Sequence, residues 1–186
     1  MELFVVVFGA LFSVMNPLST VPMFVALTHD HTKIERGRIA LMSAINVTVI
    51  LVISYFVGKY ILVFFGISVD SLKIAGGLII ASSGFALLTG KFTEHKGMKK
   101  SKVRTDAQTR EDIALTPLAI PMIAGPGTIS LLITFNQEST GVSYTLIIMA
   151  AILLSAILIF LMLRGSHSIV KILGASGINA LSRIIG

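Results

Sequence analysis

The chain alternates between long apolar stretches and short polar ones. Five apolar stretches are near the roughly 20 residues that a helix needs to cross the hydrocarbon core of a bilayer. They cover residues 3–28, 39–57, 72–89, 113–135 and 142–163. Two shorter apolar pieces, residues 61–67 and 169–173, are each followed by a small polar turn. This pattern predicts an all-α membrane protein, a helical bundle with several spanning helices.

The composition indicates the same class. Of the 186 residues, 54% are hydrophobic and only 13% are charged, whereas a soluble domain carries roughly 25% charged residues. The first apolar stretch starts almost at Met1 with no basic residue before it, and it is longer than a signal-peptide core. We therefore expect it to stay in the mature protein. The chain has no cysteine, which excludes disulfides and thiolate metal sites.

Basic residues gather in three of the polar segments. These are residues 29–38, the lysine-rich linker 91–112 and residues 164–171. Because cytoplasmic loops carry an excess of Lys and Arg, we predict that the N-terminus lies outside and that the linker is cytoplasmic. We interpret the net charge of +6 as this topology signal beside anionic lipid head groups, and not as a nucleic-acid interface.

Two of the apolar stretches are interrupted by proline, glycine and small polar residues. The first interruption is NPLSTVP at residues 16–22, and the second is PMIAGPGTIS at residues 121–130. A helix in lipid cannot leave backbone N–H and C=O groups unpaired, so broken backbone is tolerated there only where it is buried in protein or lines a cavity. The two interruptions therefore predict a functional site.

Similar residues recur at a nearly constant distance along the chain. Asn16-Pro17 precedes Gly125-Pro126 by 109 positions, and Gly66 precedes Gly174 by 108. The run KIAG at residues 73–76 resembles RIIG at residues 183–186, which lies 110 positions further on. These shared offsets predict an internal repeat.

The repeat divides the chain into residues 1–90 and 113–186, joined by the linker 91–112. Three helices in each half would place the halves in opposite orientations, which is the inverted-repeat plan of many secondary transporters. The first helix of each half would be broken, at NPLSTVP and at AGPGTIS. The sixth helix would be incomplete at Gly186, so we expect a natural full-length chain to continue for roughly 15 to 20 apolar residues.

Several longer motifs resemble a known family. NPLSTVPMF, PLAIPMIAGPGTIS, GISVDSLKIAGGLIIASSGFALLTG and GINALSRIIG are similar to the MarC family of bacterial and archaeal inner-membrane proteins, also labelled UPF0056. The resemblance runs along essentially the whole chain. It implies a six-helix protein of the cytoplasmic membrane, similar to members described as SnatA-like transporters of small neutral amino acids such as glycine or alanine. The chain departs from the family's pattern at its end, where the final hydrophobic helix is absent.

The chemistry of the interruptions suits a small zwitterion. A helix that starts at a break presents unpaired N–H groups and the positive end of its dipole to a carboxylate. Hydroxyl groups close by would serve an ammonium group or a coupling cation. The predicted substrate-binding residues are Asn16, Pro17, Ser19, Thr20, Gly125, Pro126, Gly127, Thr128 and Ser130. The alternative interpretation is a pair of proline kinks packed on small residues.

Asn46 is the most polar residue within the second apolar stretch. It is costly to expose to lipid, so we expect it to face the bundle. It either lines the solute pathway or bonds a neighbouring helix, and the sequence leaves both interpretations open.

The apolar stretches contain no carboxylate and no histidine. All nine carboxylates and all four histidines lie at their ends or in the polar segments. No nucleophile with a base, carboxylate pair or metal cluster occurs within them, so we expect neither an enzyme nor a metal or cofactor site. Transport would be facilitated or coupled to a cation, with Asp70 as the fallback proton carrier. A channel or a structural membrane protein is the alternative, and a homo-oligomer stays open.

Overall fold

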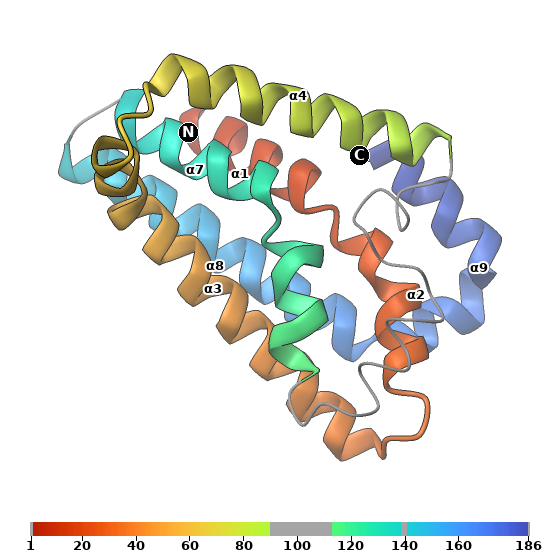
Figure 1. Ribbon diagram of the computed structural model, residues 1–186. Helices are drawn as coiled ribbons and strands as arrows, with labels where there is room; N and C mark the ends of the chain where they lie inside the picture. Colours follow the sequence, from red (N-terminus) through yellow and green to blue (C-terminus); the bar gives the residue numbers. More distant parts are fainter. Residues whose placement is uncertain (1, 90–112, 139–140, 186) are drawn as a thin grey trace.

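The computed structural model describes residues 2–89, 113–138 and 141–185 and places them in a bundle of helices (Figure 1). Among these residues there is no β-strand. The elements are α1 (Glu2–Met15), α2 (Pro17–Leu27), α3 (Lys33–Phe64), α4 (Val69–Leu88), η1 (Ala114–Ile123), α7 (Pro126–Glu138), α8 (Val142–Arg164) and α9 (Ser166–Ile185). The predicted linker 91–112 lies outside the described residues.

Four helical stretches are long and apolar enough to cross a bilayer. They are Glu2–Leu27, Lys33–Phe64, Val69–Ala86 and Val142–Arg164. The bent pair of η1 and α7 gives a fifth if it is counted as one span. The predicted class, an all-α membrane protein with several spans, is thereby confirmed.

The helix α3 is longer than the apolar stretch that predicts it. Its start is fixed by a capping box, in which Thr32 Oγ1 accepts a hydrogen bond from Glu35 N and the Glu35 carboxylate accepts one from Thr32 N. At the other end α3 continues to Phe64, so the apolar piece at residues 61–67 extends this helix instead of forming a separate element.

Glycine ends α3 and interrupts α9 in the same way. Gly66 follows α3 with φ 65°, a left-handed conformation that glycine adopts at low cost. Ile67 N then donates to the Leu62 carbonyl at 2.9 Å, which satisfies one of the last carbonyls of the helix. Gly174 has the same φ of 65° and divides α9 into two helical pieces.

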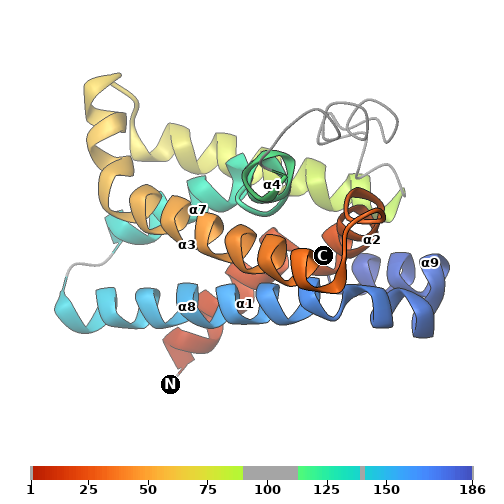
Figure 2. The ribbon, with the colours of Figure 1, turned by 90° about the horizontal axis from the view of Figure 1, so that it is seen from below.

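The core lies where the broken helices meet α3 and α8. Figure 2 shows α3 and α8 side by side, and contacts join α3 to α7 and η1, α1 to α8, α2 to α9, and α4 to α7. Close packing is possible because some contacts involve glycine, as at Gly58, where an added Cβ would overlap the side chain of Ile133. The largest fully buried side chains are Tyr55, Phe24, Leu11, Met15, Leu51, Leu118, Ile123, Leu132, Ile148, Ile152, Ile159 and Leu163.

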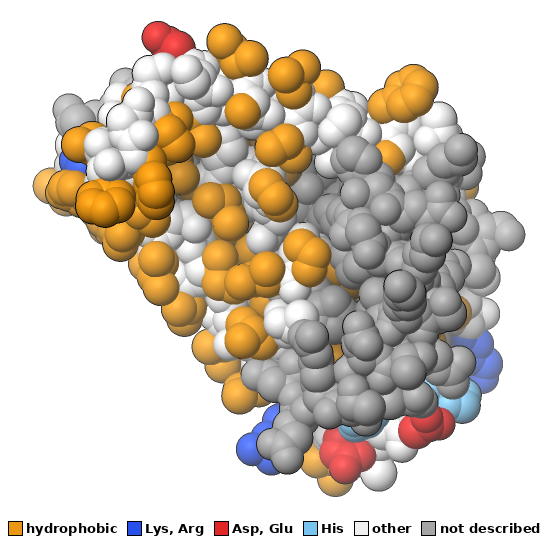
Figure 3. Space-filling view, viewed as in Figure 1, with side chains coloured by type: hydrophobic (Ala, Val, Ile, Leu, Met, Phe, Trp, Pro, Cys, Tyr) orange, Lys and Arg blue, Asp and Glu red, His pale blue; other side chains and the backbone are white. Residues whose placement is uncertain are grey.

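Large apolar side chains also cover the outside of the bundle. On the face shown in Figure 3 they gather along α3 and lie in separate patches over α4, with charged side chains toward the ends. Exposed examples are Ile45 and Ile53 on α3 and Ile74 and Leu78 on α4. A soluble monomer rarely exposes such a surface, so this exterior is suited to lipid.

Charged and histidine side chains gather at the end of the bundle where α2 meets α3. Arg36 donates to the carbonyl of Thr28 at 3.0 Å and to that of His29 at 2.8 Å, which holds the α2–α3 connection against α3. His167, at the start of α9, has a lowered pKa because of partial burial and the positive charges of Arg36 and His29. The start of α9 therefore lies beside this connection.

Candidate site at the two interrupted helices

The first interruption consists of one residue, Asn16. Its backbone is left-handed, with φ 39° and ψ 67°, a conformation that asparagine tolerates better than most residues. Asn16 N still donates to the Phe12 carbonyl at 3.0 Å, which completes α1. The Asn16 side chain then caps α2 by accepting a hydrogen bond from Ser19 N at 3.3 Å. Asn16 is 1% exposed, so this cap lies inside the protein.

The second interruption is spread over a longer segment. Thr116 (φ −128°, ψ 119°) and Ile120 (φ −122°, ψ 128°) have extended backbone within η1. Each precedes a proline, whose ring disfavours helical geometry at the residue before it. At the end of η1, Ala124 N donates to the carbonyl of Ala119, five residues back, at 2.9 Å. The chain then turns, and the axes of η1 and α7 differ by 65°.

The helix α7 starts at this second interruption. Pro126 is its first residue, where the missing N–H costs nothing and the fixed φ suits the helix. The first backbone hydrogen bond at this end runs from Ile129 N to the Gly125 carbonyl at 3.1 Å. The N–H groups of Gly127 and Thr128 precede it, so they belong to the unpaired first turn of the helix.

The two interruptions lie next to each other. A Cβ added at Gly127 would lie 3.5 Å from Val14 Cγ1, two residues before Asn16. The elements around them also touch, since α1 contacts α7 and α2 contacts η1. In Figure 1 the first residues of α2 and α7 both lie near the middle of the molecule, and the two helices leave it in opposite directions. The bundle thus brings two helix N-termini together in its interior.

Three of the predicted hydroxyl groups donate to carbonyl oxygens at these breaks. Ser19 Oγ donates to Asn16 O at 2.8 Å, and Thr20 Oγ1 donates to Pro17 O at 2.6 Å. Across the site, Thr128 Oγ1 donates to Ile123 O at 3.3 Å. Since each hydroxyl has one hydrogen and two lone pairs, the oxygens keep acceptor capacity while their hydrogens are engaged. Each oxygen can therefore still accept a hydrogen bond from a donor such as an ammonium group.

Ser130 and Gly127 pack against α4. Ser130 Oγ donates to the Leu72 carbonyl at 3.3 Å, and a Cβ added at Gly76 would overlap this hydroxyl. The open face of Gly127 is closed by Ile80, whose Cγ1 would lie 3.2 Å from an added Cβ. Both residues therefore hold α7 against α4. The Ser130 hydroxyl bonds α4, whereas the other three hydroxyls bond carbonyls at the breaks.

Two buried serines carry hydroxyls without a partner. Ser43 on α3 is 0% exposed and Ser155 on α8 is 1% exposed, and neither Oγ has a hydrogen-bond partner in the described part of the chain. Leaving a buried hydroxyl unpaired costs about 1–3 kcal/mol, which makes both groups candidates to meet a polar solute. Ser155 was not among the predicted residues. Its position 109 residues after Asn46 is the signal that could have found it.

Asn46 itself is partly buried on α3, and no hydrogen bond of its side chain occurs among the described residues. Its predicted place in the pathway stays a prediction. Within the described ranges no group of three or more His, Asp or Glu residues could hold a metal ion. Asp70, the fallback proton carrier, is exposed at the start of α4.

Comparison with known proteins gives one family along the whole chain. The model of the MarC family integral membrane proteins matches residues 1–186. A UPF0056 membrane protein of Buchnera aphidicola subsp. Schizaphis graminum is 37% identical over 185 residues, which are 100% of this chain and 85% of the relative. YhcE of Escherichia coli K12, also named a UPF0056 membrane protein, is 37% identical over 179 residues, or 96% and 82% of the two chains.

The UPF0056 inner membrane protein MarC of Escherichia coli K12 / DH10B is 36% identical over 182 residues, which cover 92% of this chain and 81% of that protein. No solved structure matches the chain.

Proposed function

We propose that this chain, which belongs to the MarC family of integral membrane proteins, is a secondary transporter of small neutral amino acids or similar small solutes. The observation that carries the proposal is the pairing of two helix N-termini, one at the buried Pro17 and one where the buried Gly127 and Thr128 follow the exposed Pro126. Both lie beside hydroxyl oxygens that can still accept hydrogen bonds. The solute would bind between the breaks, and alternating access would open this site to either side of the membrane in turn.

A zwitterion fits this site better than an ion does. The N-termini of α2 and α7 carry the positive ends of their helix dipoles, which favour a carboxylate. The oxygens of Ser19, Thr20 and Thr128 can accept hydrogen bonds from an ammonium group. None of the predicted site residues carries a full charge, so a charged solute side chain would be buried there without a counter-ion. A small neutral amino acid avoids that cost.

An inverted repeat, which we infer from shared spacings along the chain, would support alternating access. Gly66 and Gly174 are 108 positions apart and share φ 65° after a helix, and Pro17 and Pro126 are 109 apart and each begin a half-helix. We infer two structurally related halves, residues 1–90 and 113–186. An odd number of spans in each would give opposite orientations. The N-terminus would lie outside and the basic linker 91–112 inside the inner membrane.

The buried serines extend the site along the bundle. The unpaired hydroxyls of Ser43 and Ser155 lie on α3 and α8, the two helices that pack against each other beside the broken ones. A pathway past them would let the solute exchange its hydrogen bonds with water for hydrogen bonds with protein. We include Asn46 in this pathway because it occupies the position of Ser155 in the first half.

The test is solute flux into liposomes that contain the purified protein. We expect uptake of radiolabelled alanine or glycine to saturate with concentration and to be accelerated by unlabelled solute on the opposite side. Protein-free liposomes and liposomes with a Gly77→Leu variant are the controls, because nothing lies within 4 Å of a Cβ added at Gly77. Flux that rises linearly with concentration would indicate a channel. No flux of any small neutral amino acid would favour a structural role and contradict the proposal.

A further inference from the structure

An apolar groove runs along the outside of the bundle between α3 and α8. Its volume is about 340 Å³. The two helices pack side by side in opposite directions, and Tyr55 Oη and Thr145 Oγ1 lie 3.4 Å apart near one end of the contact. The lining residues are Leu41, Ala44, Ile45, Thr48, Val49, Leu153, Ala156, Ile157 and Phe160.

The groove has a narrow floor and high sides. Ala44 and Ala156 are only 5% and 8% exposed and form its floor, while larger exposed side chains such as Ile45 and Leu153 form the rims. The one hydroxyl in the lining, Thr48 Oγ1, donates to the Ala44 carbonyl of its own helix at 2.8 Å. The lining therefore has no free hydroxyl hydrogen to donate to a polar ligand, and the groove suits a hydrocarbon chain.

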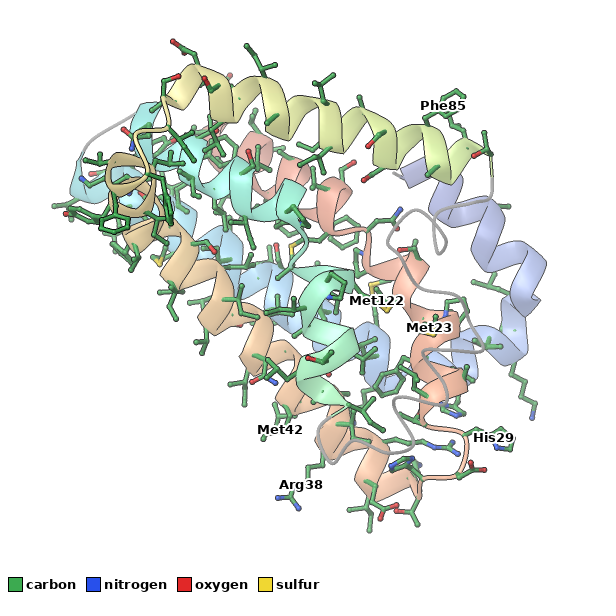
Figure 4. All side chains as sticks on the ribbon, viewed as in Figure 1. Met23, His29, Arg38, Met42, Phe85 and Met122 are labelled. Carbon is green, nitrogen blue, oxygen red and sulfur yellow. The ribbon has the colours of Figure 1, made fainter. Side chains whose placement is uncertain are left out.

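One end of the groove is positively charged. The Arg164 guanidinium lies over the ring of Phe160, a lining residue, at 5.6 Å from its centroid. Arg38 lies one helical turn before Leu41, on the row that Ile45 and Val49 continue. Figure 4 shows Arg38 projecting away from the bundle at this end of α3. Because α3 and α8 run in opposite directions, both arginines lie one turn beyond the same end of the groove.

Both guanidinium groups are available to a ligand. Arg38 and Arg164 are exposed, and in the described ranges neither has a hydrogen bond or an ion pair. The ion pair between His29 and Asp30 involves neither of them. An apolar groove that ends at two exposed cations matches a ligand with a hydrocarbon chain and an anionic head.

We propose that the groove binds an anionic phospholipid of the leaflet that faces the basic end of the bundle. One acyl chain lies along the groove between α3 and α8, and the phosphate lies between Arg38 and Arg164. Guanidinium groups bind phosphate oxygens in a bidentate manner, and basic pockets between membrane helices are known to bind anionic head groups. The inference depends on the membrane-spanning class of the protein and not on the proposed transport.

A second copy of the chain fits this groove less well. Two copies related by a two-fold axis along the membrane normal would bring the same surface of each together. Arg38 and Arg164 of both copies would then meet at one depth in the membrane. Four cations without counter-ions would repel each other, whereas a lipid phosphate neutralises them.

The absence of tryptophan from the chain permits a direct test. Leu153→Trp places a single fluorophore on the rim of the groove, and Phe85→Trp places one on α4, where Phe85 is exposed and points away from the bundle in Figure 4. Each variant is reconstituted in bilayers that contain brominated phosphatidylglycerol or brominated phosphatidylcholine, whose acyl chains quench tryptophan. We expect phosphatidylglycerol to quench more strongly at position 153 and both lipids to quench equally at position 85.

Charge variants then identify the head-group contacts. Arg38→Gln and Arg164→Gln, each combined with Leu153→Trp, should lower the preference for phosphatidylglycerol by about fivefold per arginine. Lys59→Gln, at the other end of α3, removes one charge as well and should leave the preference unchanged.

Equal quenching by both lipids at position 153, or a preference that survives both arginine variants, would overturn the proposal. The proposal would also be overturned if neither lipid quenched the tryptophan of Leu153→Trp and if two copies of a Leu153→Cys variant formed a disulfide. That result assigns the groove to a second copy, because the chain has no other cysteine.

Discussion

At the first interruption the chain leaves helical geometry at one residue, Asn16, whereas at the second it does so at several points between Thr116 and Gly125. Asn16 takes a left-handed backbone and caps α2 with its own side chain. The second interruption has extended residues before prolines, a hydrogen bond from Ala124 N to the carbonyl five residues back and a bend of 65°. Both lead to a helix that begins with proline, which is buried at Pro17 and exposed at Pro126.

The difference shows where each interruption is vulnerable. The geometry of the first depends on one side chain, so a single substitution there removes both the backbone conformation and the cap. The geometry of the second depends on several prolines and on the packing of Gly127 against α1 and α4. It should therefore resist the loss of any single polar contact and yield to an increase in side-chain volume.

The largest effect is expected from Asn16→Leu. A leucine disfavours the left-handed backbone by about 1–2 kcal/mol and removes a cap worth about 1 kcal/mol. We expect a loss of about 2–3 kcal/mol in the free energy of unfolding in detergent, and loss of transport. Asn16→Asp keeps the capping oxygen and Asn16→Gly keeps the backbone conformation, so both should be more stable than Asn16→Leu. Equal stability of all three variants would contradict the role of Asn16.

Gly127→Leu tests the second interruption by adding side-chain volume at Gly127. The space beside Gly127 is filled by Ile80 and Val14, so a larger side chain must push α7 away from α1 and α4. We expect a loss of about 2 kcal/mol, as is usual for overpacking, and separation of the two helix N-termini. The matched control is Gly77→Leu, which has open space around it. Similar unfolding curves for the two variants would show that the interruptions do not pack as described.

Thr128→Val and Ser19→Ala compare a hydroxyl group at the second interruption with one at the first. Each removes a hydrogen bond to a carbonyl at a break, worth about 1 kcal/mol. Each also removes an acceptor for the solute's ammonium group, so we expect the concentration for half-maximal transport to rise about tenfold. Thr128→Ser, which keeps the hydroxyl, should restore the affinity. If only one of the two variants raised the half-maximal concentration, the solute would contact only the interruption that carries that residue.

Ser130→Ala should have the smallest effect. Its hydroxyl bonds the Leu72 carbonyl on α4, away from the other hydroxyls. We expect a loss of about 0.5–1 kcal/mol in stability and unchanged affinity for the solute. A rise in the half-maximal concentration equal to that of Thr128→Val would place Ser130 at the solute after all.

Sequence patterns predict the spans and the positions of the interruptions because these depend on local chemistry. Apolar length marks a spanning helix, and proline often marks a break, although Pro22 lies inside α2 without ending it. The same rule would have found the extended backbone at Thr116, since Pro117 follows it. Ser155 lies 109 positions after Asn46, so the spacing of the predicted repeat likewise points to Ser155.

The direction in which a side chain points is harder to predict. Thr128 and Ser130 are two positions apart on α7, yet one bonds the end of η1 and the other bonds α4. Which face of α7 meets which neighbour depends on the packing of the whole bundle. The sequence therefore suggests both residues for one site, and only the tertiary arrangement separates them.

The contact between Ser130 and Gly76 has a mechanical consequence. It joins α4 to α7, and α4 packs mainly on α7 while its other face is exposed. These two helices therefore form one unit, which packs on the rest of the bundle mainly through the contact of α7 with α3. An α-helix rises about 1.5 Å per residue, so the 13 residues of α7 span about 20 Å. A change of about 10° in the bend before Pro126 would move the far end of α7 by about 3 Å, and this shift would slide α7 and α4 together along α3.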